Sequence, residues 1–209
     1  MKGRVRIMHK NEFERSRWSG GVTTELAIWP DNAVYPNGPF TWRLSTARIE
    51  ADETSFTPLP GKNRILMLLE GSVRLEHKDH HKVDLKPLEQ DTFEGNWETR
   101  SFGKGTDFNL IMDEYCFGEL IHLSLPIGGT MNVQTQTDRE FDRNYGMMAE
   151  SYYCLAGTVK IQFSNGYVVQ IHRGDLFSYY GYLGNEQISF KLINEDRQEA
   201  SFVRAQIFY

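Results

Sequence analysis

Two pairs of polar side chains stand at spacings that would aim each pair to one side of a β-strand. Arg43 and Ser45 are two residues apart, and so are Asp107 and Asn109. Alternate residues of a strand share one face of the sheet. A guanidinium donates two parallel hydrogen bonds to a carboxylate, and an amide donates and accepts at once. These pairs indicate a pocket for a small carboxylate, whereas the alternative for Asp107 and Asn109 is to satisfy backbone groups of loops.

A second arginine, Arg64, stands directly before an apolar run of five residues, Ile65–Leu69. A charged residue at the start of an apolar strand often marks the rim of a barrel, where it reaches a ligand in the mouth. The alternatives are an exposed cap for Arg64 and a structural ion pair of Arg43 with Glu25 or Glu70. Thr24, which follows a glycine-rich loop, completes the set of candidate ligand contacts.

Histidines gather at His77, His80 and His81. The neighbours of His80 and His81 are lysine and aspartate, which is typical of a solvated hairpin tip, and adjacent strand residues point to opposite faces. We therefore expect no metal and no cofactor. No Ser-His-Asp arrangement, acid–base pair of carboxylates or nucleophilic cysteine motif can be assembled from the spacing, so no catalytic residue is assigned.

Short apolar alternations between turn residues position these side chains. Trp42, Leu44 and Thr46 alternate with Arg43, Ser45 and Ala47, which is the period of a strand with two different faces. Asn165-Gly166 is a two-residue hairpin signal, since both residues tolerate positive φ. Helical turns fit only at Asn11–Arg17 and Asp138–Tyr145. The sequence predicts an all-β fold.

An internal repeat organises the strands. Three segments recur in the same order: Leu69–Leu75 as Leu155–Ile161, Val83–Leu85 as Val169–Ile171, and Asp91–Phe93 as Asp175–Phe177. Two copies of a five-to-seven-stranded unit predict two β-barrel or jelly-roll halves, because closure removes exposed strand edges. We expect residues 1–115 to form the first half and 116–209 the second, packed as one compact unit.

The repeated turn, hairpin and Asp-x-Phe pattern is also typical of cupin half-barrels. Four motifs of the first half, together with this pattern, resemble the HutD/Ves family: Trp18–Ala27, Phe40–Ala47, Leu68–Gly71 and Gly105–Met112. The family's first motif usually reads Trp-x-Asn-Gly-Gly-Gly, so the Ser-Gly-Gly-Val that follows Trp18 departs from it. The Trp-Arg-x-Ser-x-Ala strand is the most specific match, and we expect Arg43 to contribute more than Arg64.

The resemblance implies a cytoplasmic bacterial bicupin without an established enzymatic activity. It implies a regulator of histidine utilisation that senses a small anionic metabolite, formylglutamate or urocanate. Two other functions stay open. A metal-free cupin enzyme of the isomerase or epimerase type would need a histidine base, for which only His122 and His172 remain. A protein-interaction module would use Tyr179–Tyr182 as an exposed anchor, and a homodimer is compatible with all three.

Composition excludes several partners. The chain has 209 residues and a net charge of −5, so it lacks the basic surface that nucleic-acid binding needs. The six basic residues among residues 1–17 indicate a solvated arm or an edge strand. The start has no apolar signal segment, and the longest uncharged run is broken by proline and glycine, so we expect no membrane partner. Two cysteines fit reduced thiols and a cytoplasmic location.

Overall fold

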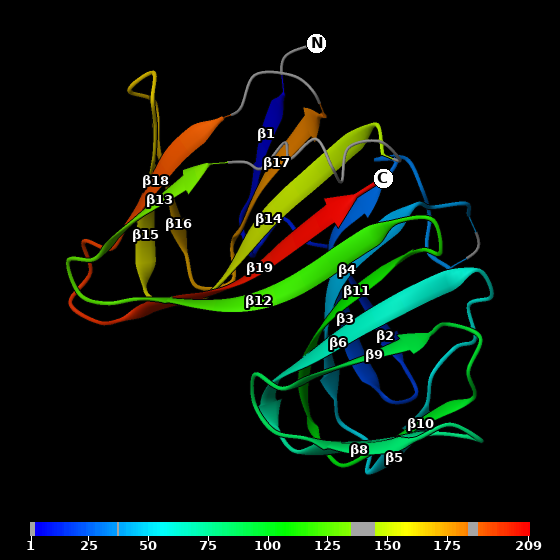
Figure 1. Ribbon diagram of the computed structural model, residues 1–209. Helices are drawn as coiled ribbons and strands as arrows, with labels where there is room; N and C mark the ends of the chain where they lie inside the picture. The colour runs from blue at the N-terminus through cyan, green and yellow to red at the C-terminus, as the bar shows by residue number, and fades with distance from the viewer. Residues whose placement is uncertain (1–2, 37, 135–144, 184–187) are drawn as a thin grey trace. The chain divides into compact units, whose positions relative to one another are not determined.

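The computed structural model describes residues 3–36, 38–134, 145–183 and 188–209. These residues contain nineteen strands and no helix, which confirms the all-β prediction (Figure 1). Within these ranges, nothing helical is long and apolar enough to cross a membrane. The expected helical turn at Asn11–Arg17 is wrong, because a bend there leads into strand β2 (Arg15–Trp18). The other expected turn, at Asp138–Tyr145, lies almost wholly outside the described residues.

The strands divide into two units. The first unit is Phe13–Phe117, and the second is Gly118–Tyr209 together with the segment up to Glu12. The expected halves, 1–115 and 116–209, are therefore corrected at the N-terminus. Strand β1 (Arg4–Met8) pairs antiparallel with β17 (Leu176–Tyr182), so it belongs to the second unit and forms the edge of a sheet there.

The first unit is built from two sheets. The larger sheet has the order β2, β3 (Gly21–Trp29), β4 (Trp42–Ile49), β11 (Gly105–Asp113), β6 (Lys62–Gly71) and β9 (Gln90–Glu94). The smaller sheet has the order β5 (Glu53–Ser55), β10 (Thr99–Phe102), β7 (Val73–His77) and β8 (Lys82–Leu85). Leu66 and Leu68 of the larger sheet pack with Leu75 of the smaller one, so the sheets enclose an apolar core.

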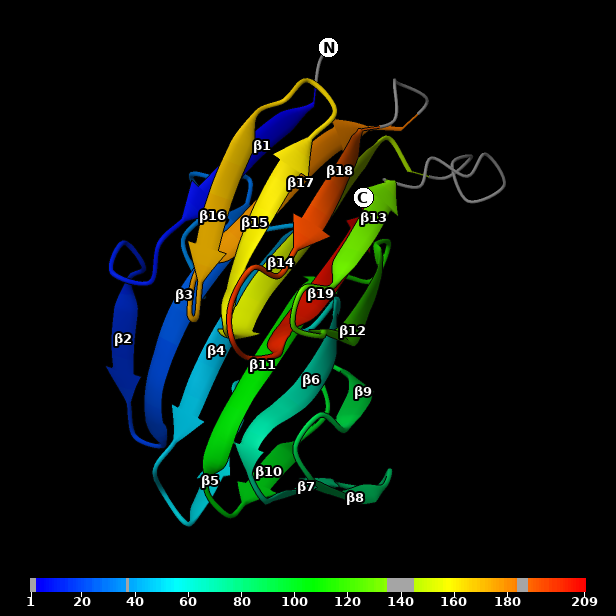
Figure 2. The ribbon, with the colours of Figure 1, turned by 90° about the vertical axis from the view of Figure 1, so that its left-hand side faces the viewer.

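The second unit repeats this plan. Its larger sheet has the order β1, β17, β14 (Met147–Ala156), β19 (Ala200–Phe208) and β12 (Phe117–Leu125). Its smaller sheet has the order β13 (Thr130–Gln134), β18 (Ser189–Ile193), β15 (Thr158–Phe163) and β16 (Val168–His172), as Figure 2 shows. Tyr152, Phe177 and Phe190 belong to the core between the two sheets.

Strand order and local geometry correspond between the two units at the positions of the predicted repeat. The order β4-β11-β6-β9 of the first unit corresponds to β12-β19-β14-β17 of the second. A β-bulge leaves Leu69 unpaired in β6 and Leu155 unpaired in β14, the same position of the repeat. The turns that follow use Gly71 and Gly157, with φ of 91° and 79°, where glycine alone is unstrained.

The hairpin expected at Asn165-Gly166 is present between β15 and β16. The backbone N–H of Phe163 donates to the carbonyl of Tyr167, so the loop has three residues rather than two. Gly166 has φ of 83°, which is the conformation that closes a three-residue hairpin.

Candidate functional site

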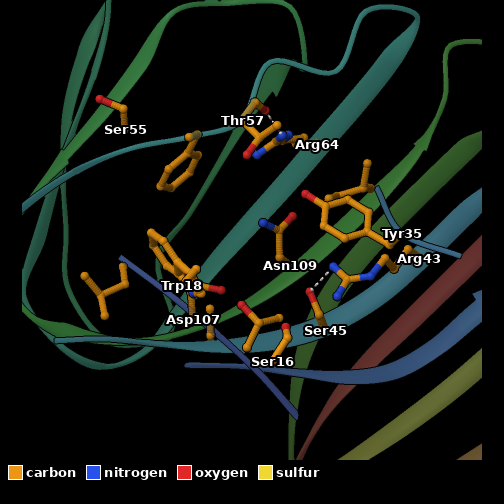
Figure 3. A pocket seen from close by; sticks show the side chains of 15 residues that line it. Ser16, Trp18, Tyr35, Arg43, Ser45, Ser55, Thr57, Arg64, Asp107 and Asn109 are labelled. Carbon is orange, nitrogen blue, oxygen red and sulfur yellow. Dashed lines mark hydrogen bonds between the residues drawn. The ribbon is translucent and has the colours of Figure 1, made fainter. Parts of the chain in front are cut away.

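A cavity of about 190 Å³ opens on the inner face of the larger sheet of the first unit (Figure 3). Its floor comes from alternate residues of β4 and β11, and its walls come from β6, from β2 and β3, and from the segment Ser55–Thr57. This space can hold several water molecules or one small organic molecule.

Five of the six residues that the sequence singles out line this cavity: Arg43, Ser45, Arg64, Asp107 and Asn109. The alternation of β4 directs its arginine and serine inward and places Trp42 and Leu44 on the other face. Antiparallel pairing of β4 with β11 sets Asn109 opposite Ser45, which brings the two predicted pairs onto one floor. Their binding of a ligand stays a prediction.

Thr24 does not line the cavity, and its neighbour Thr23 does. Thr23 stands opposite Ala47 of β4, on the face that carries Arg43 and Ser45. Thr24 stands opposite Thr46 and shares the other face. The sequence places the threonine on the wrong side because strand parity depends on this pairing, which the glycine-rich loop alone does not set.

The Arg43 side chain is held by three contacts and is only 4% exposed. Its Nε donates to Glu25 Oε2 at 2.7 Å, and its Nη1 donates to Ser45 Oγ at 3.0 Å. The guanidinium also lies over the ring of Tyr35, 4.1 Å from the centroid. The structural ion pair with Glu25 is therefore present, and the guanidinium still forms part of the cavity wall.

Arg64 is equally buried, so the exposed cap that was its alternative is wrong. Its Nη2 donates to the carbonyl of Thr57 at 2.5 Å, and its Nε has no hydrogen-bond partner. No carboxylate among the described residues forms an ion pair with it. Burial lowers the pKa of Arg64, against the opposite influence of Tyr35 and Asp107. A guanidinium remains charged at neutral pH all the same.

Asp107 is buried beside the two arginines, with 3% of its surface exposed. Burial raises its pKa to about 7, against a hydrogen bond from the backbone N–H of Ala47 and the charges of the arginines. Its Oδ1 and the Oδ1 of Asn109 have no partner. Figure 3 shows the Asn109 amide between the Arg43 and Arg64 side chains. Buried polar atoms are nearly always satisfied, so these two oxygens fit a donor supplied by a ligand.

The charge of the cavity is positive. Two guanidinium groups face it, and the carboxylate of Glu25 neutralises one of them. Burial raises the pKa of Asp107 to about 7, which reduces its negative charge at neutral pH. Burial removes the water that would otherwise hydrate the Arg64 guanidinium. An anion in the cavity would therefore compensate for this loss with a direct ionic contact.

Sequence reasoning missed three aromatic residues of the cavity, Trp18, Tyr35 and Phe56. Trp18 shares a face of β2 with Ser16, and its buried Nε1 has no partner. The glycine-rich loop forms the tight turn of the β2–β3 hairpin, and a Cβ on Gly20 would lie 2.0 Å from the Trp18 ring. The two-residue spacing of Ser16 and Trp18 was a usable signal, whereas Tyr35 lies in a loop that offers none.

The structure does not favour the two alternative functions. His122 and His172 belong to the second unit, and neither lines the cavity. The expected exposed anchor at Tyr179–Tyr182 is reduced to Tyr182, which is 37% exposed, because Tyr179 and Tyr180 are each only 4% exposed. Strand β17 lies between β1 and β14 in its sheet, which covers its backbone edges.

Comparison with family sequence models matches residues 10–179 to the HutD family. Among solved structures, a conserved protein of unknown function from Pseudomonas aeruginosa is 21% identical, with 98% of each chain covered and a TM-score of 0.79. HutD from Pseudomonas fluorescens is 18% identical, covers 97% of this chain and 98% of its own, and has a TM-score of 0.69.

Oxalate decarboxylase from Bacillus subtilis, whose Mn(II) centres have been characterised, is 11% identical. The match covers 97% of this chain and 76% of the decarboxylase, with a TM-score of 0.56. A cupin barrel protein from Leptotrichia buccalis is also 11% identical, with a TM-score of 0.53. These likenesses establish a cupin fold, and the division into two cupin halves stays a prediction.

Proposed function

Because the chain belongs to the HutD family, and because its cavity joins two buried arginines, we propose that it regulates histidine utilisation by binding a small carboxylate metabolite. The proposed ligands are formylglutamate and urocanate, held without turnover. We place this binder in the cytoplasm, where its two free cysteines, Cys116 and Cys154, remain reduced.

The observation that carries the proposal is the state of Arg64. A buried charge is costly unless it is paired, and this guanidinium has one carbonyl partner and a free Nε. A ligand carboxylate would accept hydrogen bonds from the guanidinium and offset the cost of its burial. Arg64 is thus the anchor of the proposed site, and this reverses the order expected from the strand motif, which favoured Arg43.

The remaining polar groups favour formylglutamate over urocanate. Formylglutamate has two carboxylates, which match the two guanidiniums, and a formamide, whose N–H suits the unpartnered Oδ1 of Asn109. Urocanate has one carboxylate, so it would pair with Arg64 alone and leave Arg43 with Glu25 as its single anionic partner. The Nε1–H of Trp18 is a further donor for either ligand.

A resident metal does not fit this cavity. The fold includes manganese proteins such as the Bacillus subtilis oxalate decarboxylase. Among the described residues that line the cavity, Asp107 is the only carboxylate, it feels the charges of both Arg43 and Arg64, and neither histidine nor cysteine is present. A cation would meet uncompensated positive charge, so no step of the proposed function runs through a metal.

Calorimetric titration of formylglutamate and urocanate tests the proposal. We expect the wild-type protein to bind at least one of them, and Arg64→Lys to weaken binding by about 2–4 kcal/mol, because an ammonium cannot copy the guanidinium fork. Arg43→Lys should cost less, since Glu25 already holds that side chain. Arg48→Lys, on the exposed end of the same strand, is the matched control.

Thermal melts of each variant would establish that it folds. Unchanged affinity in both folded cavity variants would place the ligand elsewhere. Failure of wild-type protein to bind either compound would remove both from the proposal.

A further inference from the structure

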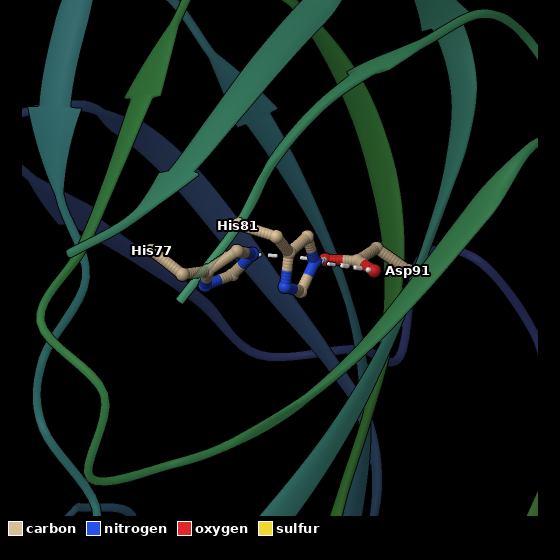
Figure 4. A group of neighbouring side chains, drawn as sticks. All are labelled: His77, His81 and Asp91. Atoms are coloured by element: carbon tan, nitrogen blue, oxygen red, sulfur yellow. Dashed lines mark hydrogen bonds and ion pairs between the residues drawn. The ribbon is translucent and has the colours of Figure 1, made fainter. Parts of the chain in front are cut away.

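A second group of ligand-type side chains lies in the first unit outside the cavity lining. His77 ends β7, His81 immediately precedes β8, and Asp91 lies in β9 (Figure 4). One ligand atom from each residue lies within 4.8 Å of the others. His77 Nε2 is 2.8 Å from Asp91 Oδ2, and His81 Nε2 is 3.1 Å from both oxygens of the same carboxylate. We call this group the histidine–aspartate cluster.

The hairpin between β7 and β8 creates the cluster. The backbone N–H of His77 donates to the carbonyl of His81, which sets the two imidazoles side by side with centroids 4.6 Å apart. His80 instead stacks on Trp97 at 3.7 Å. Adjacent strand residues such as His80 and His81 point to opposite faces and do not share an ion. The pair that converges on Asp91 is His77 and His81.

Thr99 orients the buried histidine. Its Oγ1 lies 2.8 Å from His77 Nδ1 and donates to the carbonyl of Trp97 at 3.3 Å. A hydroxyl that donates to a carbonyl accepts from the imidazole, which puts the proton of neutral His77 on Nδ1. The lone pair of His77 Nε2 then faces the carboxylate of Asp91. Both groups are hydrogen-bond acceptors, so no proton lies between them. A cation between them would satisfy both, and a fixed tautomer is the usual preparation of a metal ligand.

We propose that His77, His81 and Asp91 form a binding site for a divalent transition-metal ion, with Zn²⁺ as the first cation to test. Two imidazoles and a carboxylate suit this class of ion, and three protein ligands leave the fourth position for water. Zinc ligands about 2.0–2.2 Å from a tetrahedral ion are about 3.3 Å apart, so the present contacts need to open by a few tenths of an ångström. The His81 side chain is 41% exposed and free to make that movement.

The surrounding charges do not oppose a cation. The lysines of this hairpin, Lys78 and Lys82, are paired with Glu98 at 2.8 Å and with Glu76 at 3.0 Å. The His77 side chain is fully buried and anchors one ligand, while His81 opens the cluster to solvent. The site therefore has a rigid interior ligand and an accessible route for the ion.

Among the described residues, the second unit has no equivalent cluster. The residue that corresponds to His77 in the repeat is Phe163, which has no ligand atom. The residue that corresponds to Asp91 is Asp175, which accepts the backbone N–H groups of Lys10 and His172. Asp175 thus fixes backbone and contacts one imidazole, His9 Nδ1 at 3.1 Å, whereas Asp91 is directed at two.

Zinc titration of the full chain after treatment with a chelator tests the site, with Co²⁺ as a spectroscopic probe. We expect one ion per chain and a visible Co²⁺ spectrum of tetrahedral type. His81→Ala and Asp91→Asn should each weaken Zn²⁺ binding by at least about 100-fold, more than the roughly 10–100-fold expected for Thr99→Val, which removes only the orienting hydroxyl.

His80→Ala is the matched control, because His80 is adjacent in sequence and outside the cluster. Melting of the metal-free variants would show that they fold, and His81→Ala is the safer of the two because its side chain is partly exposed. Absence of binding to the wild-type chain would overturn the proposal, and so would equal affinity in wild type, His81→Ala and Asp91→Asn. Ligand titration into the cavity is a separate measurement, so the two proposals fail independently.

Discussion

Glu150 in the second unit occupies the repeat position that Arg64 occupies in the first, and the two charges are treated in opposite ways. Glu150 is fully buried, and its Oε1 accepts from Arg204 Nε at 2.9 Å and from the hydroxyl of Tyr152 at 2.5 Å. Its other oxygen has no partner. Arg64 has no carboxylate partner in the described part of the chain. The second unit pairs its interior charge with an opposite charge, and the first leaves its interior charge without a carboxylate.

The same contrast holds for packing. The pairing of β11 with β6 and of β19 with β14 aligns Asp107 with Phe202 and Leu66 with Tyr152. Phe202 is 1% exposed and belongs to the same core as Phe177 and Phe190 of the second unit. Large aromatic side chains thus stand where the first unit has an aspartate and a leucine. A duplicated frame can keep one copy densely packed and leave space in the other.

The first unit also has strands that the described part of the second lacks. The larger sheet of the first unit continues beyond β4 to β3 and β2, whereas the larger sheet of the second unit ends at β12, which corresponds to β4. Ser16 and Trp18 of β2 and Thr23 of β3 line the cavity. An added hairpin therefore supplies one wall of the candidate site.

Equal substitutions in the two units should give the largest difference. Arg204→Met leaves Glu150 buried without its ion-pair partner, so we expect the free energy of unfolding to fall by about 3–5 kcal/mol. Arg64→Met leaves no ion-pair partner behind and should change it by less than about 1 kcal/mol. Urea denaturation of both variants measures the contrast.

The double variant Glu150→Gln with Arg204→Met is the control, because it removes the stranded charge and should recover part of the loss. Equal losses in the two single variants would show that Arg64 is as tightly paired as Arg204, and the contrast between the units would be wrong.

Two buried aspartates should respond to pH with opposite signs. The pKa of Asp107 is raised from 3.8 to about 7, so the folded state binds a proton that the unfolded state has released. Its contribution to stability is complete below about pH 4 and is lost as pH rises to 7. We expect Asp107→Asn to stabilise the protein by about 2–4 kcal/mol at pH 8 and to have little effect at pH 4.

Asp175 is the comparison in the second unit. Burial alone would raise its pKa, but hydrogen bonds from the N–H groups of His172 and Lys10 and from His9 lower it. Its contribution is present above pH 4 and is lost as pH falls, so Asp175→Asn should destabilise the protein at pH 7. Denaturation curves from pH 2 to 8 measure both effects. The same sign in both variants would contradict this assignment.

Affinity for a carboxylate should depend on pH through the same residue. Ionised Asp107 repels an anion beside Arg64, so binding favours its protonated form. With its pKa at about 7, we expect the affinity for formylglutamate to fall about tenfold between pH 6 and pH 8. Calorimetry across this range measures the slope. Asp107→Asn should abolish it, and a slope that persists in this variant would assign the proton to another group.

The smallest expected effect tests the added hairpin. Trp18→Phe removes the Nε1–H but keeps most of the aromatic surface, so we expect ligand affinity to fall by about 1 kcal/mol, the value of one hydrogen bond. Trp29→Phe, outside the cavity lining, is the control. Equal affinities in both variants would mean that β2 contributes shape and no hydrogen bond.

Much of the candidate site could be predicted because it depends on local alternation. The period of two in one strand was enough to predict that Arg43 and Ser45 share a face. The same period in a second strand predicted this for Asp107 and Asn109. The all-β fold and the repeat followed from turn glycines such as Gly71 and Gly157, whose positive φ is a local requirement.

The rest depends on pairing between strands far apart in the sequence. Thr23 rather than Thr24 faces the cavity because of its register with Ala47. His77 meets Asp91 only when β6 pairs with β9 and β7 pairs with β10 and β8. Tyr35 reaches Arg43 from a loop whose path has no periodicity. Register and loop path are tertiary properties, and local patterns do not encode them.

Because β1 pairs with β17, the two units complete their strand pairing at different times during translation. Phe13–Phe117 contains all the strands of its own sheets and is synthesised before Gly118–Tyr209, so this unit can complete its pairing during translation. Strand β1 is made before it but must wait for β17, roughly ten seconds or more at ordinary rates of synthesis. Arg4 and Arg6 place positive charges on the waiting strand, and charged side chains are what natural sequences use to keep an exposed strand from pairing with a neighbouring nascent chain.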